Sequence, residues 1–107
     1  MLLAIDIGNT NIVAALFHED EITHEWRIHS DPNRTADEYS SIILSFFRDN
    51  GISQSYIKSG VLSSVVPLLI GPFIRLMENI IGRKPIILGP SIYDKLPVTI
   101  PKSALHE

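Results

Sequence analysis

The chain has 107 residues, of which 45% are hydrophobic, 20% are charged and none is cysteine. This length suits one domain, and the composition excludes a disordered tail, a collagen-like repeat and a coiled coil. The lack of cysteine excludes disulfide frameworks, zinc knuckles and thiol nucleophiles, while the formal net charge of −3 argues against nucleic acid as a partner.

Three strands are predicted in the first third of the chain. Residues 2–7 form an almost continuous apolar run, typical of a strand covered on both faces. A second run at 12–17 is joined to it by Gly8-Asn9-Thr10-Asn11, a link short enough for a β-hairpin with positive φ at Gly8 and Asn9. Residues 22–28 alternate, which predicts a half-exposed third strand near the sheet edge. Its inward face is expected to carry Ile22, His24, Trp26 and Ile28.

A first helix is predicted from a capping box, in which Thr35 is followed by Glu38. Gly51 is expected to end this helix. Its apolar stripe comprises Tyr39, Ile42, Ile43, Phe46 and Phe47.

A second helix is predicted after Pro67, with Gly82 as its end. Strands at 60–63 and 85–88 are expected to flank it. The apolar stripe of this helix comprises Phe73, Leu76, Met77, Ile80 and Ile81.

This order of elements predicts an α/β fold in which an antiparallel meander leads into parallel units. Because parallel crossovers are right-handed and place successive strands side by side, we expect a mixed five-stranded sheet in the order 3-2-1-4-5, with helices on its faces. Residues 1–88 would form this domain. Residues 89–107 contain three prolines and are expected to be a connector towards a second domain.

The chain is expected to be cytoplasmic and not to associate with membranes. Its longest apolar run, at 65–74, is too short to cross a bilayer, and Asp6 interrupts the apolar start too early for a signal peptide. A mean hydropathy of +0.18 is high for a small domain. This value predicts that part of the apolar surface meets another domain or subunit.

Asp6 is the first candidate site residue, because an unpaired carboxylate on a buried strand is strongly unfavourable. One interpretation is a strand end that touches solvent. The other is a carboxylate at the mouth of the hairpin that faces a metal ion. The link from Gly8 to Asn11 offers backbone N–H groups and short polar side chains that suit phosphate oxygens.

Other candidates have a structural interpretation beside the functional one. Arg34 could bind a substrate or could simply accompany the helix start. Ser63 and Ser64 lie where a parallel strand ends, so they could approach a ligand or form a strand-to-helix turn. The four histidines lack the spacing of a metal site; they are His18, His24, His29 and His106.

Four motifs in order along the chain resemble the N-terminal part of a type III pantothenate kinase. The first is shared with the wider superfamily of acetate and sugar kinases, Hsp70 and actin, whereas the combination is specific to this group. The motifs are Asp6-Ile7-Gly8-Asn9-Thr10-Asn11-Ile12-Val13, Arg34-Thr35-Ala36-Asp37-Glu38-Tyr39, Ser63-Ser64-Val65-Val66-Pro67 and Gly89-Pro90.

The resemblance implies ATP-dependent phosphorylation of pantothenate to 4'-phosphopantothenate, the first step of coenzyme A biosynthesis. It further implies a ribonuclease-H-like (actin-like ATPase) domain, a homodimer in the full-length protein, and Mg²⁺ and a monovalent cation (K⁺ or NH₄⁺) as cofactors beside ATP. Asp6 would face Mg²⁺, and Ser64, Val65 and Ile100 would lie near the substrate. The nucleotide segment would comprise Asp6, Ile7, Gly8, Asn9, Thr10, Asn11, Ile12 and Val13.

The same resemblance implies that this chain holds no catalytic base. Family members carry the base in a Gly-x-Asp-Arg motif, which is expected just beyond Glu107, and the 107-residue piece alone is therefore expected to be inactive. Ile100 stands where the family often has tyrosine. Two alternatives remain: a non-catalytic binding or regulatory module of the same fold, and a relative of the acetate or sugar kinases.

Overall fold

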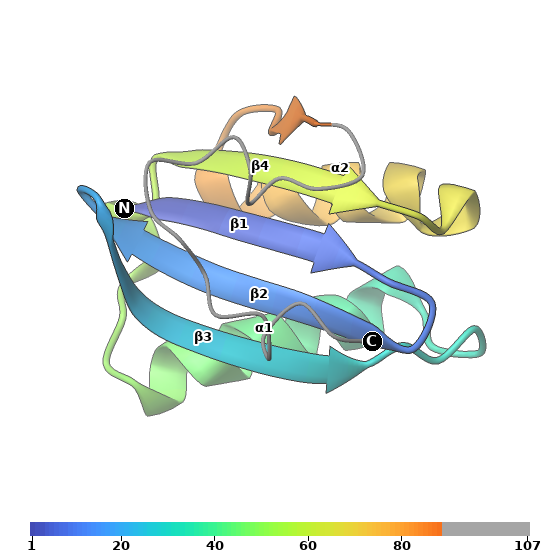
Figure 1. Ribbon diagram of the computed structural model, residues 1–107. Coiled ribbons are helices and arrows are strands. Elements are labelled where there is room, and N and C mark those ends of the chain that lie inside the picture. The colour runs from blue at the N-terminus through green and yellow to red at the C-terminus, as the bar shows by residue number, and fades with distance from the viewer. Residues whose placement is uncertain (89–107) are drawn as a thin grey trace.

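The computed structural model describes residues 1–88, which form one sheet with two helices packed behind it (Figure 1). The strands are β1 (Leu2–Ile7), β2 (Asn11–His18), β3 (Glu21–His29), β4 (Ser59–Ser64) and β5 (Ile86–Ile87). The helices are α1 (Ala36–Asp49) and α2 (Pro67–Ile81), and a short 3-10 turn, η1 (Gln54–Tyr56), precedes β4.

The strand order is β3-β2-β1-β4-β5, as predicted. Strands β1, β2 and β3 form an antiparallel meander. Strands β4 and β5 continue the sheet in parallel to β1. The fifth strand is shorter than the predicted 85–88, and its two side chains, Ile86 and Ile87, are 62% and 49% exposed. With two strands on each side, β1 lies at the centre of the sheet.

Both helices pack against the same face of the sheet. Every second residue of β1, namely Leu3, Ile5 and Ile7, is fully buried beneath them. The helices contribute their predicted stripes to this core, with Tyr39 and Phe73 meeting at 5.1 Å between ring centres. The fully buried or nearly buried helix residues are Tyr39, Ile43, Phe47, Phe73, Leu76, Met77, Ile80 and Ile81.

The opposite face of the sheet carries a second, smaller apolar cluster. Its buried members are Ala4, Val13, Ala15, Phe17 and Val61. The apolar residues of β1 are thus buried on both sides of the sheet, which explains the continuous apolar run and confirms that prediction.

A β-bulge corrects the predicted face of β3. The pairing of β2 with β3 shifts between Leu16 and Phe17, so that Thr23 is the extra residue. Trp26 follows the prediction and stacks on Phe46 of α1 at 5.1 Å. Ile22, however, pairs with Phe17 and packs in the second cluster. The extra residue turns Ile22 to the face opposite that of Trp26, which strict alternation cannot anticipate.

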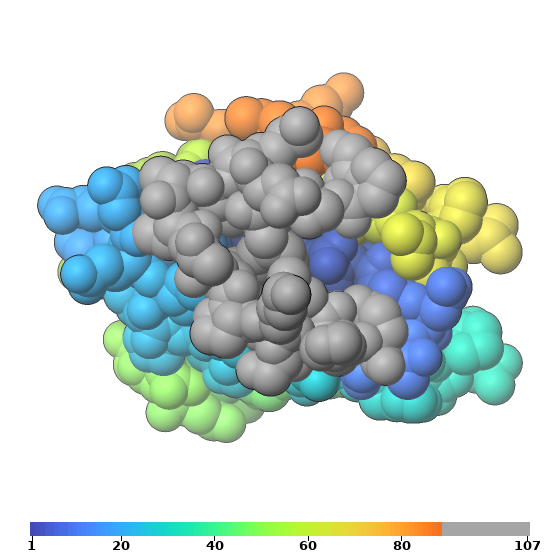
Figure 2. Space-filling view, in the orientation of Figure 1, coloured from blue at the N-terminus to red at the C-terminus, as the bar shows by residue number. Residues whose placement is uncertain are grey.

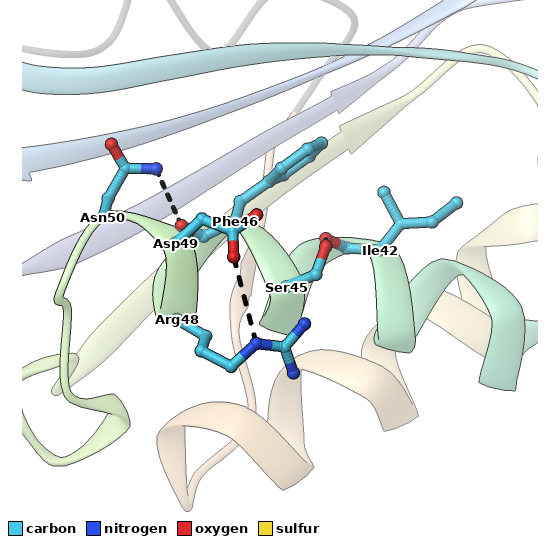
Figure 3. Close-up of polar contacts among 6 residues, drawn as sticks. All are labelled: Ile42, Ser45, Phe46, Arg48, Asp49 and Asn50. Carbon is cyan, nitrogen blue, oxygen red and sulfur yellow. Dashed lines mark hydrogen bonds and ion pairs between the residues drawn. The ribbon is translucent and has the colours of Figure 1, made fainter.

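The helix ends follow the predicted signals. Thr35 and Glu38 form a reciprocal capping box at the start of α1. At its other end, the side-chain amide of Asn50 donates to the carbonyl oxygen of Phe46 at 2.8 Å (Figure 3). Gly51 and Gly82 follow the two helices with φ of +68° and +77°, as left-handed residues after a helix do.

The hairpin between β1 and β2 does not have the predicted backbone conformation. Within residues 1–88, φ is positive only at Glu19, Gly51 and Gly82, so Gly8 and Asn9 are not left-handed. The turn closes by a hydrogen bond from the N–H of Gly8 to the carbonyl of Asn11 at 2.9 Å. The concave, positive-φ arrangement of N–H groups expected from the sequence is therefore wrong for this loop.

The packing of α2 on β4 depends on the absence of a side chain at Gly60. A Cβ atom there would lie 2.8 Å from Cε of Met77 and 3.3 Å from the carbonyl oxygen of Leu3. Gly71 on α2 is different, because the nearest atom to a Cβ there, on Arg75, is 3.6 Å away. The two glycines therefore differ in what a methyl group would meet.

We expect Gly60→Ala to lower the free energy of unfolding by about 1–3 kcal/mol, because it overfills the contact between α2 and β4. Gly71→Ala should raise it by roughly 0.5–1 kcal/mol, because alanine restricts the unfolded chain more than glycine does. Urea unfolding followed by circular dichroism measures both. Equal stability of Gly60→Ala and the parent chain would contradict the close approach of α2 to β4.

Candidate functional site

The candidate site lies at the end of the sheet where β1, β3 and β4 finish and both helices begin. Figure 1 shows the hairpin after β1, the loop after β3 and the turn from β4 into α2 together at the right-hand side, and Figure 2 shows their surfaces there in blue, turquoise and yellow. Ligands of open α/β sheets gather at the carboxyl ends of parallel strands. The amino ends of helices add a favourable potential for anions.

Asp6 stands in a row of side chains that crosses the sheet. Its backbone pairs with Val13 on β2 and Ser63 on β4, and Val13 pairs in turn with Arg27 on β3. Residues paired across strands point to the same face, and Val13 belongs to the cluster opposite the helices. Asp6 is half-buried, Ser63 is fully buried and Arg27 is exposed.

The next row towards the end of the sheet contains Asn11, which is paired with His29. Position 8 of the same region is glycine and has no side chain. Behind Asp6, the corresponding positions of β1, β2 and β4 are Ala4, Ala15 and Val61, all buried, and that of β3 is the exposed Glu25. Polar side chains on this face therefore concentrate at the hairpin end of the sheet. None of the four residues Asp6, Asn11, Arg27 and Ser63 is without an interaction partner.

The tip of the hairpin presents Asn9 and Thr10, which are both exposed. Among the described residues, neither their side chains nor their N–H groups make a hydrogen bond. The carbonyl oxygen of Thr10 accepts a hydrogen bond from Ser30 at 2.7 Å. This bond joins the hairpin to the loop after β3 and holds the backbone of the tip in place.

The predicted nucleotide segment divides into two kinds of residue. Ile7 and Ile12 are fully buried beneath the helices, and Val13 is 1% exposed in the second cluster. These three side chains are core, so they are not accessible to a ligand. The polar side chains of the segment are those of Asp6, Asn9, Thr10 and Asn11.

Ser64 has a structural role at the turn into α2. Its hydroxyl donates to the carbonyl of Val66 and accepts from the N–H of Val66, both at 2.9 Å. Ser64 is paired with Ile7, which places it on the helix side, whereas Ser63 shares the face of Asp6. Val65 is 48% exposed and its N–H donates to the carbonyl of Ile7 at 2.9 Å, so it continues the ladder to the edge of the site.

The remaining candidates have structural contacts of their own or lie outside the described residues. Arg34 donates to the carbonyl of His29 at 2.8 Å and its guanidinium lies over the ring of Tyr39, which favours the structural interpretation. His24 stacks on Trp26 at 5.6 Å. Ile100 and the predicted connector at 89–107 lie outside residues 1–88.

Two further properties concern residues 1–88 as a whole. No three His, Asp or Glu side chains there gather so that they could hold a metal ion. No helix in that range is long and apolar enough to cross a membrane. A metal ion at Asp6 would therefore need ligands other than a cluster of His, Asp and Glu side chains within residues 1–88.

Arg27 and Ser63 were not among the residues that the sequence assigned to the nucleotide segment. Arg27 is the only lysine or arginine in the strands of the described chain. This isolated charge in the alternating segment is the signal that could have indicated it. For Ser63, the signal is the register of a parallel pairing, which a single sequence does not reveal.

Comparison with known proteins gives a consistent result. Residues 2–104 match the family model described as type III pantothenate kinase. The type III pantothenate kinases of Geotalea uraniireducens and Geobacter sulfurreducens are each 40% identical to this chain over 98 residues, or 92% of it. That of an Exiguobacterium species is 36% identical over 100 residues. The chain spans only 38% to 39% of the length of these relatives.

Two solved structures share the fold at low sequence identity. A protein described as an N-acetylglucosamine kinase from Porphyromonas gingivalis has a TM-score of 0.60 and 13% identity, over 84% of this chain and 34% of that one. The ROK hexokinase from Thermus thermophilus has a TM-score of 0.60 and 18% identity, over 82% and 33%. This likeness confirms the predicted α/β fold of the actin-like ATPase type.

The structural role of Ser64 can be tested by Ser64→Ala. We expect the free energy of unfolding to fall by about 1 kcal/mol, because the hydroxyl is both a donor and an acceptor in the turn. Ser41→Ala, at an exposed position of α1, is the matched control and should change stability by less than about 0.5 kcal/mol. Thermal and urea unfolding measure both variants; an unchanged Ser64→Ala would mean that the turn does not need the hydroxyl.

Proposed function

This chain belongs to the type III pantothenate kinase family, and we propose that the protein of which it is the N-terminal part transfers phosphate from ATP to pantothenate. The product would be 4'-phosphopantothenate, in the first step of coenzyme A biosynthesis. The match of the family model to residues 2–104 carries this proposal. The resemblance drawn from the four motifs is confirmed at the level of the family.

The geometry of the hairpin supports phosphate binding at this end of the sheet. Asn9 and Thr10 present exposed amide and hydroxyl groups. The turn into α2 is joined to the end of β1, because the N–H of Val65 donates to the carbonyl of Ile7. Backbone N–H groups and short polar side chains suit phosphate oxygens. The missing positive φ at Gly8 and Asn9 means that the loop would receive phosphate on its outer surface and through its side chains.

Asp6 has the chemistry expected of a Mg²⁺ ligand. Mg²⁺ is bound in kinase sites through one or two carboxylates, water and the phosphates of the substrate. A single half-buried carboxylate beside a phosphate-binding loop fits this pattern. The bound ion would supply neutralisation of the phosphate charge. The monovalent cation, K⁺ or NH₄⁺, and the homodimer belong to the same proposal and involve the rest of the protein.

Phosphoryl transfer needs positioning and charge neutralisation more than covalent chemistry. Residues 1–88 would supply the first of these through a hairpin that is anchored to β3 and a carboxylate on the central strand. The catalytic base and most of the pantothenate pocket would come from the remainder of the protein. Val65, at the exposed edge of the site, is the residue of this part that we place nearest to pantothenate.

Removal of one polar group should be costly in the complete kinase. We expect Asp6→Ala or Asn9→Ala to lower the rate of phosphoryl transfer by about two orders of magnitude, as the loss of one preorganised electrostatic group does. A coupled assay of ADP release with ATP, Mg²⁺ and pantothenate measures the rate.

Asp20→Ala and Asn79→Ala are the matched controls, because both residues are exposed and lie away from the hairpin. Both should leave the rate within about two-fold of the parent, in line with surface substitutions that touch no site. Circular dichroism verifies that all four variants are folded. Near-normal turnover of either Asp6→Ala or Asn9→Ala would refute the proposed nucleotide site.

The 107-residue chain alone should release no ADP in a pantothenate-dependent manner, because it lacks the proposed base. It should also self-associate in light scattering, since Leu68, Ile86 and Val65 are 88%, 62% and 48% exposed. Turnover by this chain would place the base within residues 1–107. A stable monomer would show that these apolar side chains need no partner.

A further inference from the structure

We propose that Arg27 binds the polyphosphate of the nucleotide. Arg27 lies on β3 and Asp6 on β1, on either side of β2. This proposal rests on the proposed function, because it requires ATP at the hairpin end of the sheet. It assigns to β3 a part in the site that the motif at residues 6–13 does not contain.

The strand register places Arg27 and Asp6 in one row. Arg27 and Asp6 both pair with Val13, from opposite sides, and therefore point to the same face of the sheet. Their backbones are separated by two inter-strand spacings, or roughly 9–10 Å. A cation and a carboxylate thus lie on either side of the buried Val13 in one row, with Asn11 in the next row towards the hairpin.

A polyphosphate on this face of the sheet would meet both negative and positive side chains. The carboxylate of Asp6 repels phosphate unless cations offset it. Arg27 is the only lysine or arginine in the strands of residues 1–88, and it is exposed on the face of Asp6. Glu25 lies on that face too, opposite Ala15, one row farther from the hairpin. The positive charge is therefore nearer to the proposed phosphate position than the second negative one.

The guanidinium group of an arginine is well suited to phosphate. Its planar donors match two phosphate oxygens at once, and it stays charged at every physiological pH. A basic residue on an edge strand has another explanation, however, because such charges discourage pairing with other chains. That role needs only a charge at the edge, whereas phosphate binding needs the position and the donors of Arg27. The two roles predict different effects on ligand affinity.

The test compares Arg27→Gln and Arg27→Lys in the complete kinase. Calorimetry measures the affinity for a non-hydrolysable ATP analogue with Mg²⁺, and separately for adenosine. We expect Arg27→Gln to weaken binding of the analogue about 10-fold or more, as the loss of a charged hydrogen bond does, and to leave adenosine unchanged. Arg27→Lys should recover part of the loss. In kinetics, the KM for ATP should rise more than kcat falls.

Arg48→Gln is the control, because it removes the same charge from an exposed position at the far end of α1 (Figure 3). It should leave both affinities unchanged. Unchanged binding of the analogue by Arg27→Gln would overturn the proposal and leave the edge role. An equal loss for the analogue and adenosine would also overturn it, since that indicates a disturbed fold.

The wild-type enzyme separates this proposal from the function on which it rests. If the wild type neither binds the ATP analogue nor phosphorylates pantothenate, both are wrong. If the wild type does both and Arg27→Gln behaves like Arg48→Gln, only the role of Arg27 is wrong.

Discussion

Strand β1 is covered on both faces, and its end nevertheless carries a carboxylate. Burial of an unpaired charge is strongly unfavourable, so the strand can include Asp6 only where polar groups or solvent are within reach. The structure satisfies this requirement by placing Asp6 half-buried beside Ser63, at the end of the sheet where the apolar rows stop. The position of the candidate site thus follows from the electrostatics of a single central residue.

The packing of the helices gives this end of the sheet its rigidity. Both helices cover one face and begin near the hairpin (Figure 1). The hydrogen bond from Ser30 to Thr10 joins the hairpin to the loop before α1, and Tyr39 exchanges hydrogen bonds at 3.0 Å with the backbone of Asp31 in that loop. The hairpin residues that we propose bind phosphate are thereby connected to Tyr39, whose ring is fully buried.

The sequence predicted the elements of this fold well because each has a local signal. The capping box at Thr35, the glycines after the helices and the apolar run of β1 all depend on near neighbours in the chain. The bulge at Thr23, the φ values of the hairpin and the side of the sheet that each serine of Ser63-Ser64 occupies depend on pairing with distant strands. Those features decide which side chains meet at the site. The motif could therefore be located from the sequence, whereas Arg27 is visible there only as an isolated charge, and its place in the row of Asp6 depends on strand pairing.

The parallel pairing of β1 with β4 also has a consequence for how the chain acquires its structure. Strands β1, β2 and β3 are joined by short turns, whereas the pairing of β1 with β4 brings together residues far apart in the sequence, such as Leu2 and Ser59. Contacts between distant residues form more slowly than local ones. During synthesis the meander can form early. One edge of β1, an apolar strand, then remains unpaired until β4 has been made, and such edges promote aggregation. The central strand of the finished domain is therefore its most vulnerable edge while the chain is still being made.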